Sequence, residues 1–443
     1  MKPTGLILGL AALSVMAACT EEEAILPGER EGIRDVLSDE TVTEAPVNAE
    51  AAARDVPLAL PPAEVNADWR QRIGTPATRA AHPALARDPQ FAWSVGVGTG
   101  NGRRNRISAD PVVAQGRIYT LDARAQVSAV SPAGERLWTR DLTPPNDSAN
   151  DAGGGGLAFG DGKLFVSSGF GLLTALDPAD GSVLWQQNLR STGTGSPAVS
   201  GGLVYLVSGD EVGWAIDTDD GRIRWQLSAT PDINNVHGGP APALTDKYAI
   251  FAFGSGEVQG AFRRGGLRRW DAPVAGQREG YAAGRVGDIT GDPVVSGDKV
   301  FVGSHSGRTV ALALGNGERV WTAGDGALNP VWPAGRSVFM VSDRNELMRL
   351  SAEDGSVIWS RPLPFFTKSR PKRQTRIYGH YGPVIAGGQL IVASGDGLLR
   401  LYDPATGEPT GSVEMPDGAA SNPVVAGNTL YVVSGKGRLL AFR

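Results

Sequence analysis

Cysteine and histidine, the residue types of zinc and redox sites, are scarce in this 443-residue sequence, and their spacing favours neither kind of site. There is one cysteine, Cys19, and there are four histidines, His82, His237, His305 and His380. No histidine stands at metal-ligand spacing from another histidine or from the cysteine, as a zinc site would require. A lone cysteine also excludes an intramolecular disulfide. We therefore expect no metal site and no cofactor held by a disulfide.

Other patterns resemble catalytic motifs without their essential parts. The run Gly303-Ser304-His305-Ser306-Gly307 has histidine where a nucleophile elbow has serine. Gly153 to Gly156 has no Lys-Ser/Thr after it, so a phosphate-binding loop is not indicated. Asp177, Asp217 and Asp403 recur in register, and carboxylates repeated in this way cap turns. We expect no catalytic residues, and a nearly neutral body predicts no nucleic-acid interface.

Two clusters of cations could still bind a partner. The first is Arg263, Arg264, Arg268 and Arg269, which fall in an expected outer hairpin and which we interpret as solvated. The second is Lys368, Arg370, Lys372, Arg373 and Arg376, in a long loop. The sequence leaves open whether this second cluster is solvated or meets an acidic partner or lipid headgroups.

A repeat supplies the elements that would position these residues. From Phe91 onward one unit returns every 40 to 50 residues. It reads Pro, two apolar residues, a glycine turn, two strands and Asp-x-x-x-Gly-x-x-x-Trp. The eight copies begin at Pro111, Leu157, Pro197, Pro242, Pro293, Pro330, Pro383 and Pro423. The eighth copy stops at Arg443 before its last strand, and Phe91–Val95 has the pattern of that missing strand.

Four-stranded sheets repeated around an axis form a β-propeller. We predict an all-β, eight-bladed β-propeller with four-stranded antiparallel blades over residues 91–443, closed by pairing of the N-terminal strand into the last blade. Closure removes two free strand edges. Tryptophans end seven of the strands and are predicted to dock between neighbouring blades, each N–H on a carbonyl. They are Trp93, Trp138, Trp185, Trp225, Trp270, Trp321 and Trp359.

The N-terminus has the features of an export signal. The apolar stretch 6–18 is too short to span a bilayer, which takes about 20 residues, so we predict a signal peptide over 1–18. Met16-Ala17-Ala18-Cys19 resembles a bacterial lipobox, which would make Cys19 the lipidated first residue. The other interpretation is an ordinary signal peptide followed by a buried thiol. Residues 19–90 are predicted to be an acidic, Ala/Pro-rich and largely disordered linker whose parts 68–70 and 82–85 pack back onto the propeller.

Unequal loops favour one face of the propeller as a binding surface. In each blade the connection to the next blade lies on the same face as the turn between the second and third strands. Four of these connections are long: 143–156, 230–241, 275–292 and 364–382. Because loops carry function more often than the strands that hold them, we predict that partners bind on this face.

Two families share these motifs. Residues 175–185, ALDPADGSVLW, resemble the tryptophan-docking repeat of pyrroloquinoline quinone dehydrogenases, which hold their quinone with a vicinal disulfide and use calcium. With one cysteine that disulfide cannot form, which argues against the enzyme. An eightfold repeat of this type behind a lipobox is similar to the BamB family of outer-membrane protein assembly lipoproteins. The resemblance covers the signal and residues 91–443. It implies a non-enzymatic scaffold without a cofactor, lipid-anchored to the outer membrane with its body in the periplasm.

The resemblance also implies partners. In that family, loops leading into the fourth and fifth blades bind the periplasmic POTRA domains of the BamA insertase, within the BAM complex that inserts outer-membrane proteins. Other BAM subunits and nascent outer-membrane proteins are further expected partners. The family's two motifs map onto residues 234–238 and 285–290. The expected partner-binding residues are therefore Asn234, Val236, His237, Arg285, Asp288 and Thr290, of which Val236, Arg285 and Asp288 match the motifs in type.

The sequence leaves two other functions open. One is a quinoprotein dehydrogenase-like periplasmic enzyme that binds its cofactor without a disulfide. The other is a lipid-anchored module that binds cell-wall glycan through aromatic side chains of the long-loop face. Phe365, Phe366, Tyr378 and Tyr381 would be available for that role.

Overall fold

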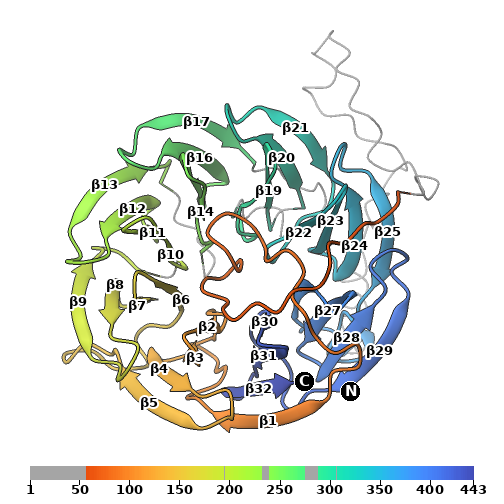
Figure 1. Ribbon diagram of the computed structural model, residues 1–443, viewed down its shortest axis with the longest axis horizontal. Coiled ribbons are helices and arrows are strands. Elements are labelled where there is room, and N and C mark those ends of the chain that lie inside the picture. Colours follow the sequence, from red (N-terminus) through yellow and green to blue (C-terminus); the bar gives the residue numbers. More distant parts are fainter. Residues whose placement is uncertain (1–55, 194, 232–238, 275–287, 306) are drawn as a thin grey trace, which may run out of the picture. The chain divides into compact units, whose positions relative to one another are not determined.

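The computed structural model describes residues 56–443 except 194, 232–238, 275–287 and 306. Eight four-stranded sheets, all antiparallel, are formed by the described residues and stand around a common axis (Figure 1). The prediction of an all-β, eight-bladed propeller is confirmed.

In blades 1 to 7 the strands run from the axis to the rim in chain order, and in blade 8 the N-terminal strand β1 takes the outermost place. Blade 1 holds β2 (Val112–Ala114), β3 (Arg117–Leu121), β4 (Gln126–Val130) and β5 (Arg136–Asp141). Blade 2 holds β6 (Gly155–Gly160), β7 (Lys163–Ser168), β8 (Leu172–Leu176) and β9 (Val183–Asn188). Blade 3 holds β10 (Ala198–Ser200), β11 (Leu203–Ser208), β12 (Val212–Asp217) and β13 (Ile223–Ser228). Blade 4 holds β14 (Ala243–Leu244), β15 (Tyr248–Ala252), β16 (Glu257–Phe262) and β17 (Arg268–Pro273).

The second half of the ring repeats this order. Blade 5 holds β18 (Val294–Ser296), β19 (Lys299–Gly303), β20 (Thr309–Ala313) and β21 (Arg319–Ala323). Blade 6 holds β22 (Trp332–Ala334), β23 (Ser337–Val341), β24 (Glu346–Ser351) and β25 (Val357–Pro362). Blade 7 follows a short 3₁₀ turn, η2 (Pro371–Arg373), and holds β26 (His380–Ala386), β27 (Gln389–Ser394), β28 (Leu398–Tyr402) and β29 (Pro409–Glu414). Blade 8 holds β30 (Val424–Ala426), β31 (Thr429–Val433), β32 (Arg438–Phe442) and β1 (Phe91–Gly96).

The N-terminal strand closes the ring. β1 pairs antiparallel with β32, from Phe91 opposite Phe442 to Gly96 opposite Arg438. Gln90 and Arg443 exchange two further backbone hydrogen bonds of 2.6 and 2.9 Å. The predicted closure is confirmed, and the two ends of the repeat region lie side by side.

Burial explains the strand patterns. The inner strands of each blade are covered on both sides by neighbouring blades, so they are almost continuously apolar; β11, for example, is buried over Val204–Ser208. The outer strands β5, β9 and β13 instead alternate between exposed and half-buried residues. They meet a neighbouring blade on one side only.

The seven tryptophans lie where each blade meets the next. The Trp185 Nε1–H donates to the carbonyl of Thr218 at 3.1 Å, and a Cβ on Gly221 would stand 2.7 Å from the indole ring. Gly221 has φ +75°, so the turn itself also favours glycine. The other six pairs repeat this contact: Trp93 with Gly134, Trp138 with Gly181, Trp225 with Gly266, Trp270 with Gly317, Trp321 with Gly355, and Trp359 with Gly407. Each motif glycine therefore receives the tryptophan of the preceding blade.

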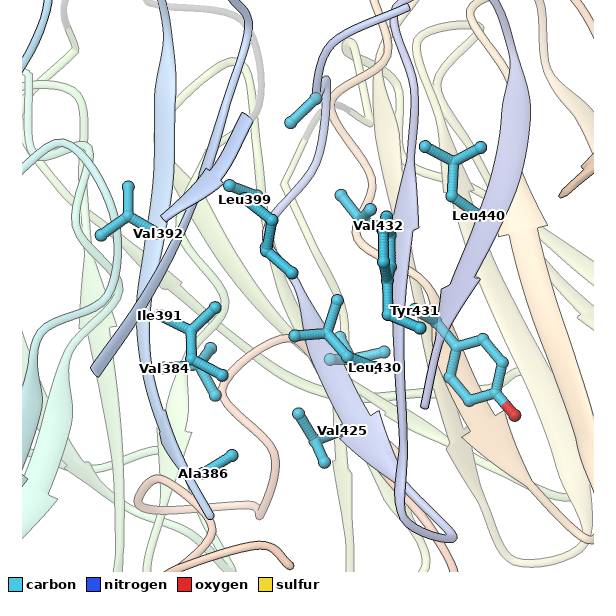
Figure 2. Close-up of a cluster of buried hydrophobic side chains, with 14 of the residues drawn as sticks. Val384, Ala386, Ile391, Val392, Leu399, Val425, Leu430, Tyr431, Val432 and Leu440 are labelled. Carbon is cyan, nitrogen blue, oxygen red and sulfur yellow. The ribbon is translucent and has the colours of Figure 1, made fainter. Parts of the chain in front are cut away.

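This arrangement accounts for the copy without a tryptophan. An indole from blade 7 would dock on the turn between the third and fourth strands of blade 8, but Gln90 and Arg443, at the two ends of the repeat region, stand there instead. Aliphatic side chains pack this junction: Figure 2 shows Ile391 and Leu399 of blade 7 beside Leu430 of blade 8.

An open groove of about 440 Å³ lies over the outer strands of blade 7. Its lining residues are Leu398, Arg400, Tyr402, Pro409, Thr410, Gly411 and Ser412.

Residues 64–85, here called the axial segment, lie at the centre of the ring (Figure 1). The segment closes on itself, because Glu64 donates its N–H to the carbonyl of His82 and accepts from the N–H of Ala84. The linker of residues 19–90 was predicted to be largely disordered, with 68–70 and 82–85 packed back. The described residues 56–90 contact the blades along most of this length. Trp69 is 1% exposed, and Ile73 and Arg79 are also buried.

The axial segment contacts the blades in ring order. Backbone or side-chain hydrogen bonds reach blade 8 from Asn66, blade 1 from Trp69, blade 2 from Arg70, blade 3 from Gln71, blade 4 from Pro76, blade 5 from Ala77 and blade 7 from Pro83. Blade 6 is reached by Arg79, whose guanidinium lies 4.5 Å from the ring centre of Trp332. In six blades the contacted residue stands two places after the first residue of the repeat: Val113, Phe159, Val199, Leu244, Val295 and Val425. A position that the repeat provides in every blade thus serves as the attachment point.

Candidate partner-docking face

The two ends of the propeller differ in what covers them. One end, the plug face, carries the turns between first and second strands and between third and fourth strands. The axial segment lies there, since it bonds to the ends of the first strands. The opposite end, the loop face, carries the turns between second and third strands and the connections between blades. The isolated bridges Ile289↔Ser304, Ala327↔Ser342 and Ala419↔Ser434 tie three such connections to the second strands on this face.

Polar residues precede the first strand in blades 1, 3, 5 and 8, namely Asp110, Ser196, Asp292 and Asn422. Arg72 pairs with the two aspartates: its Nε lies 2.9 Å from Asp292 Oδ2 and 3.7 Å from Asp110 Oδ2. Asn422 donates its backbone N–H and its side-chain amide to Asp110 at 2.7 and 2.9 Å, and Asp292 accepts the N–H of Ala241. One arginine therefore ties blades 1 and 5 together.

Burial and charge shift the pKa values of this group in opposite directions. Burial alone would lower the pKa of Arg72, but attraction by Asp292 and Asp110 outweighs it and the net pKa is raised. Burial raises the pKa of Asp110, opposed by the charge of Arg72 and the hydrogen bonds of Asn422. Burial lowers the pKa of Arg79 to about 10, although Asp292 and Asp110 attract it. The formal charges of Arg72 and Arg79 balance those of Asp110 and Asp292, so this group of four side chains has no net charge.

The contacts of this centre join blades 1 and 5 to the axial segment. Arg79 is stacked against Trp332 and lies 5.5 Å from the ring centre of Trp69. Over the described ranges of 56–443, no group of three or more His, Cys, Asp or Glu residues is placed to hold a metal ion. Asp177, Asp217 and Asp403 each accept a backbone N–H two residues further on, at 2.7 to 2.8 Å, and so cap their turns.

The loop face carries one long connection that the sequence analysis missed. Residues 97–111 join β1 to β2 and present Arg103, Arg104 and Arg106 to solvent. The segment is ordered by its own contacts, for example the N–H of Ile107 on Asn101 Oδ1 at 2.8 Å. The signal was the distance from Trp93 to Pro111, which is as long as the four connections that were recognised. The four recognised connections all follow the first complete repeat, whereas 97–111 precedes it and was therefore overlooked.

The predicted partner-binding residues fall in two groups. Asn234, Val236, His237 and Arg285 lie outside the described residues. Asp288 is only 2% exposed, and its carbonyl accepts the N–H of His305 at 2.9 Å. Thr290 is half-buried and its Oγ1 donates to the carbonyl of Ala327 at 3.2 Å. Both described members lie at the base of a loop-face connection, and their contact with a partner stays a prediction.

The connection between blades 6 and 7 projects as a short finger, residues 363–379. Thr367 and Tyr378 donate their N–H groups to the carbonyls of Arg376 and Phe365 at 3.0 and 2.9 Å, and Phe366 and Ile377 form an antiparallel bridge. Cations occupy the tip: Lys368, Arg370, Lys372, Arg373 and Arg376, all exposed. The second basic cluster of the sequence analysis therefore stands on an ordered hairpin-like element.

Two side chains hold the base of this finger. Asn345 donates from Nδ2 to the carbonyl of Tyr378 at 3.1 Å. His380 is bonded through Nε2 to the carbonyl of Pro364 at 2.8 Å and through Nδ1 to Ser394 Oγ at 2.7 Å. A carbonyl can only accept, so Nε2 carries the proton and Nδ1 accepts from the hydroxyl. Burial lowers the pKa of His380, and the charge of Arg400 adds to this effect.

Comparison with known proteins identifies the family. The sequence model of the family described as outer membrane protein assembly factor BamB matches residues 123–361 and 369–443. The chain belongs to the BamB family. The family resemblance found in the sequence is thereby confirmed.

Individual BamB proteins are similar over most of their length. The BamB of Shewanella oneidensis is 26% identical over 364 residues, covering 79% of this chain and 88% of that protein. The BamB of Escherichia coli is 29% identical over 316 residues, covering 70% and 78%. The crystal structure of BamB from Moraxella catarrhalis superposes with a TM-score of 0.66 at 18% identity, covering 80% of this chain and all of that one.

Quinone enzymes share the fold with the BamB family. Quinohemoprotein alcohol dehydrogenase from Comamonas testosteroni superposes with a TM-score of 0.64 at 16% identity, covering 86% of this chain and 81% of that one. At this identity the likeness extends to the fold alone. Among the residues described, no helix is long and apolar enough to cross a bilayer. Cys19 and the predicted signal peptide lie outside the described residues.

Proposed function

We propose that this protein is a non-enzymatic scaffold subunit of the BAM complex. In this proposal it binds the periplasmic POTRA domains of BamA and assists insertion of outer-membrane proteins, in contact with other BAM subunits and nascent chains. It is held at the outer membrane by a lipid on Cys19, with its body in the periplasm and with no cofactor. The observation that carries the proposal is the family match over residues 123–361 and 369–443.

The contrast between the two faces supports docking on the loop face. On the plug face, the central ends of the first strands are already bonded to the chain's own axial segment. The loop face presents connections of unequal length, and surface loops on a rigid frame are where partner-binding residues usually stand. We assign the BamA contact to the connections into blades 4 and 5, through Asn234, Val236, His237, Arg285, Asp288 and Thr290.

A pull-down from detergent-solubilised membranes tests the function. The affinity tag is placed after Arg443, because this end belongs to the third strand of blade 8 and leaves from the plug face. The proposal expects co-purification of BamA with the wild-type protein. Recovery of the tagged protein without BamA, from membranes in which BamA is abundant, would contradict it.

Single variants test the assigned residues. Arg285→Glu reverses a charge in the predicted contact, whereas Asp288→Asn keeps the size of a side chain that is 2% exposed and avoids burying a cation. Arg269→Glu, on the exposed outer strand β17, is the matched control. We expect lower BamA recovery with Arg285→Glu and Asp288→Asn only. Equal recovery from all three variants would show that the contact residues are assigned wrongly, while the scaffold role would stand.

The lipid anchor is tested separately. Cys19→Ser removes the only thiol, so acyl labelling should be lost. A variant that still incorporates labelled fatty acid would contradict lipidation at Cys19.

A further inference from the structure

The finger between blades 6 and 7 lies partly outside the family match. The match ends at residue 361 and resumes at 369, so it leaves out 362–368. That stretch contains Phe365, Phe366 and Lys368, which form the first side of the finger. The composition of the finger is not explained by the shared scaffold role alone.

Apolar side chains are displayed at the stem of the finger. Phe365, Phe366 and Ile377 are 37%, 41% and 52% exposed. The two phenylalanine rings meet edge to face with centroids 4.7 Å apart, and Phe366 stands opposite Ile377 in the bridge. Exposed apolar side chains that gather at one place, next to polar residues, mark a candidate site for a protein or membrane contact.

Charge at the tip is of one sign only. Residues 361–380 include six arginines and lysines and not one aspartate or glutamate. Arg361, at the end of β25, is paired with Glu408 at 2.6 Å. The five cations of the tip have no ion pair with any residue in the described part of the chain. The tip therefore presents a free positive charge next to exposed aromatic rings.

Backbone hydrogen bonds keep this surface in a fixed shape. The two sides are joined at residues 365–367 and 376–378, and the turn at the tip is closed by the N–H of Arg373 on the carbonyl of Arg370 at 2.8 Å. Gln374 adds a side-chain bond to the carbonyl of Ser369 at 3.3 Å. An ordered finger can present its charges without first losing conformational freedom.

We propose that the finger 363–379 docks on an anionic phospholipid surface. Phe365, Phe366 and Ile377 enter the boundary between headgroups and acyl chains, and the cations of the tip contact lipid phosphates. Aromatic and aliphatic side chains beside lysine and arginine are the composition of interfacial membrane anchors. An acidic protein segment would satisfy the cations but would leave the exposed rings in water. The inference goes beyond the proposed scaffold role and adds a second membrane contact to the lipid on Cys19.

Vesicle co-sedimentation tests the proposal without the acyl chain. Residues 20–443, which keep every described residue, are mixed with vesicles of phosphatidylglycerol and phosphatidylcholine, or of phosphatidylcholine alone. We expect sedimentation with the anionic vesicles only, and loss of it as the salt concentration approaches about 1 M, where charges are screened within about 3 Å.

Three double variants locate the contact. Lys372→Glu with Arg373→Glu should weaken vesicle binding about 25-fold or more, since each cation near such a surface contributes about a factor of five. Phe365→Ser with Phe366→Ser should weaken binding while leaving its salt dependence. Arg264→Glu with Arg269→Glu makes the same charge change in the outer hairpin of blade 4, away from the finger, and should have little effect.

The outcomes separate the proposal from its competitors. Absence of wild-type binding to anionic vesicles overturns it, as does equal weakening by the blade 4 control. Binding to soluble poly-aspartate together with indifference to vesicles would identify the tip as a site for an acidic protein segment and would also overturn it. If the wild-type protein fails to recover BamA but still binds anionic vesicles, the result would count against the scaffold role alone.

Discussion

The plug face and the loop face are built from the same eight repeats but use different parts of them. The axial segment attaches at a position that recurs in the blades, such as Val113, Val199 and Val295. The loop face instead depends on connections that differ from blade to blade, such as 97–111 and the finger 363–379. Features shared by the blades hold the ring together, and features that distinguish them can select a partner.

This division predicts unequal consequences of substitution. Buried contacts at the axis tie several blades at once, so their loss should be felt throughout the ring. Exposed loop residues make few such contacts and should alter binding while leaving stability within about 0.5 kcal/mol. The predictions below set one face against the other, beginning with the largest effect.

Trp69→Ala should destabilise the protein most. Trp69 is 1% exposed, pairs with Val113 through two backbone hydrogen bonds of 2.7 and 2.8 Å, and packs near Trp332. Removing a buried indole leaves a cavity and costs about 3–5 kcal/mol. The free energy of unfolding from urea titration measures it, with Phe366→Ala on the loop face as the control. Similar losses for both variants would erase the distinction between the faces.

Arg72→Met tests the ionic centre. It leaves Asp292 and Asp110 buried without their nearest cation, which costs about 3 kcal/mol, the lower end for a broken buried pair. The low end is expected because Arg79 still attracts both carboxylates. Adding Asp292→Asn removes one of the unpaired charges and should restore part of the stability. A double variant less stable than the single one would show that Asp292 matters for its bond to Ala241 and not for its charge.

The ring could be predicted from the sequence because its causes are periodic. The Asp-x-x-x-Gly-x-x-x-Trp motif places a glycine turn and an indole at a fixed distance, and the missing last strand was recognisable at Phe91–Val95. The sequence did not show that each tryptophan packs on the glycine of the following blade. Trp185 meets Gly221, 36 residues on, although its own motif glycine is Gly181.

The axial segment escaped prediction for a physical reason. Successive residues such as Trp69, Arg70 and Gln71 contact three different blades, so the segment has neither the period of a strand nor that of a helix. Its apolar residues are single and its composition is that of a linker. Only Trp69 and the region around His82 stood out.

For the docking face, the family likeness supplied the residue assignments, and most of those residues lie outside the described ranges.

A matched pair of glycines measures the junction between blades. Gly221 and Gly162 have nearly the same φ, +75° and +74°, but only Gly221 faces an indole, that of Trp185. Alanine at Gly162 should cost about 1–2 kcal/mol for the left-handed conformation alone. Alanine at Gly221 adds the clash at 2.7 Å, worth about a further 1–3 kcal/mol. Thermal unfolding of both variants gives the difference. Equal losses would mean that the indole yields freely and contributes little to the junction.

The smallest effect is a pH dependence at the base of the finger. Because burial lowers the pKa of His380 below its usual value of about 6.5, the unfolded chain takes up a proton at a pH where the folded protein does not. Stability contributed by neutral His380 is therefore complete above about pH 6.5 and falls as the pH drops toward the folded pKa, by at most about 1.4 kcal/mol per pH unit. His380→Gln keeps a donor for Pro364 and cannot titrate.

Unfolding free energies of wild type and His380→Gln, measured between pH 7.5 and 5.5, should therefore converge as the pH falls. Loosening should begin locally, since the carbonyl of Pro364 belongs to the finger and Tyr378 donates its N–H to Phe365 beside it. Amide exchange at Tyr378 should accelerate in acid in the wild type before the plug face responds. Parallel stability curves for the two proteins would mean that a group other than His380 causes the pH dependence. Simultaneous amide exchange at Tyr378 and Trp69 would mean that the two faces unfold as one unit.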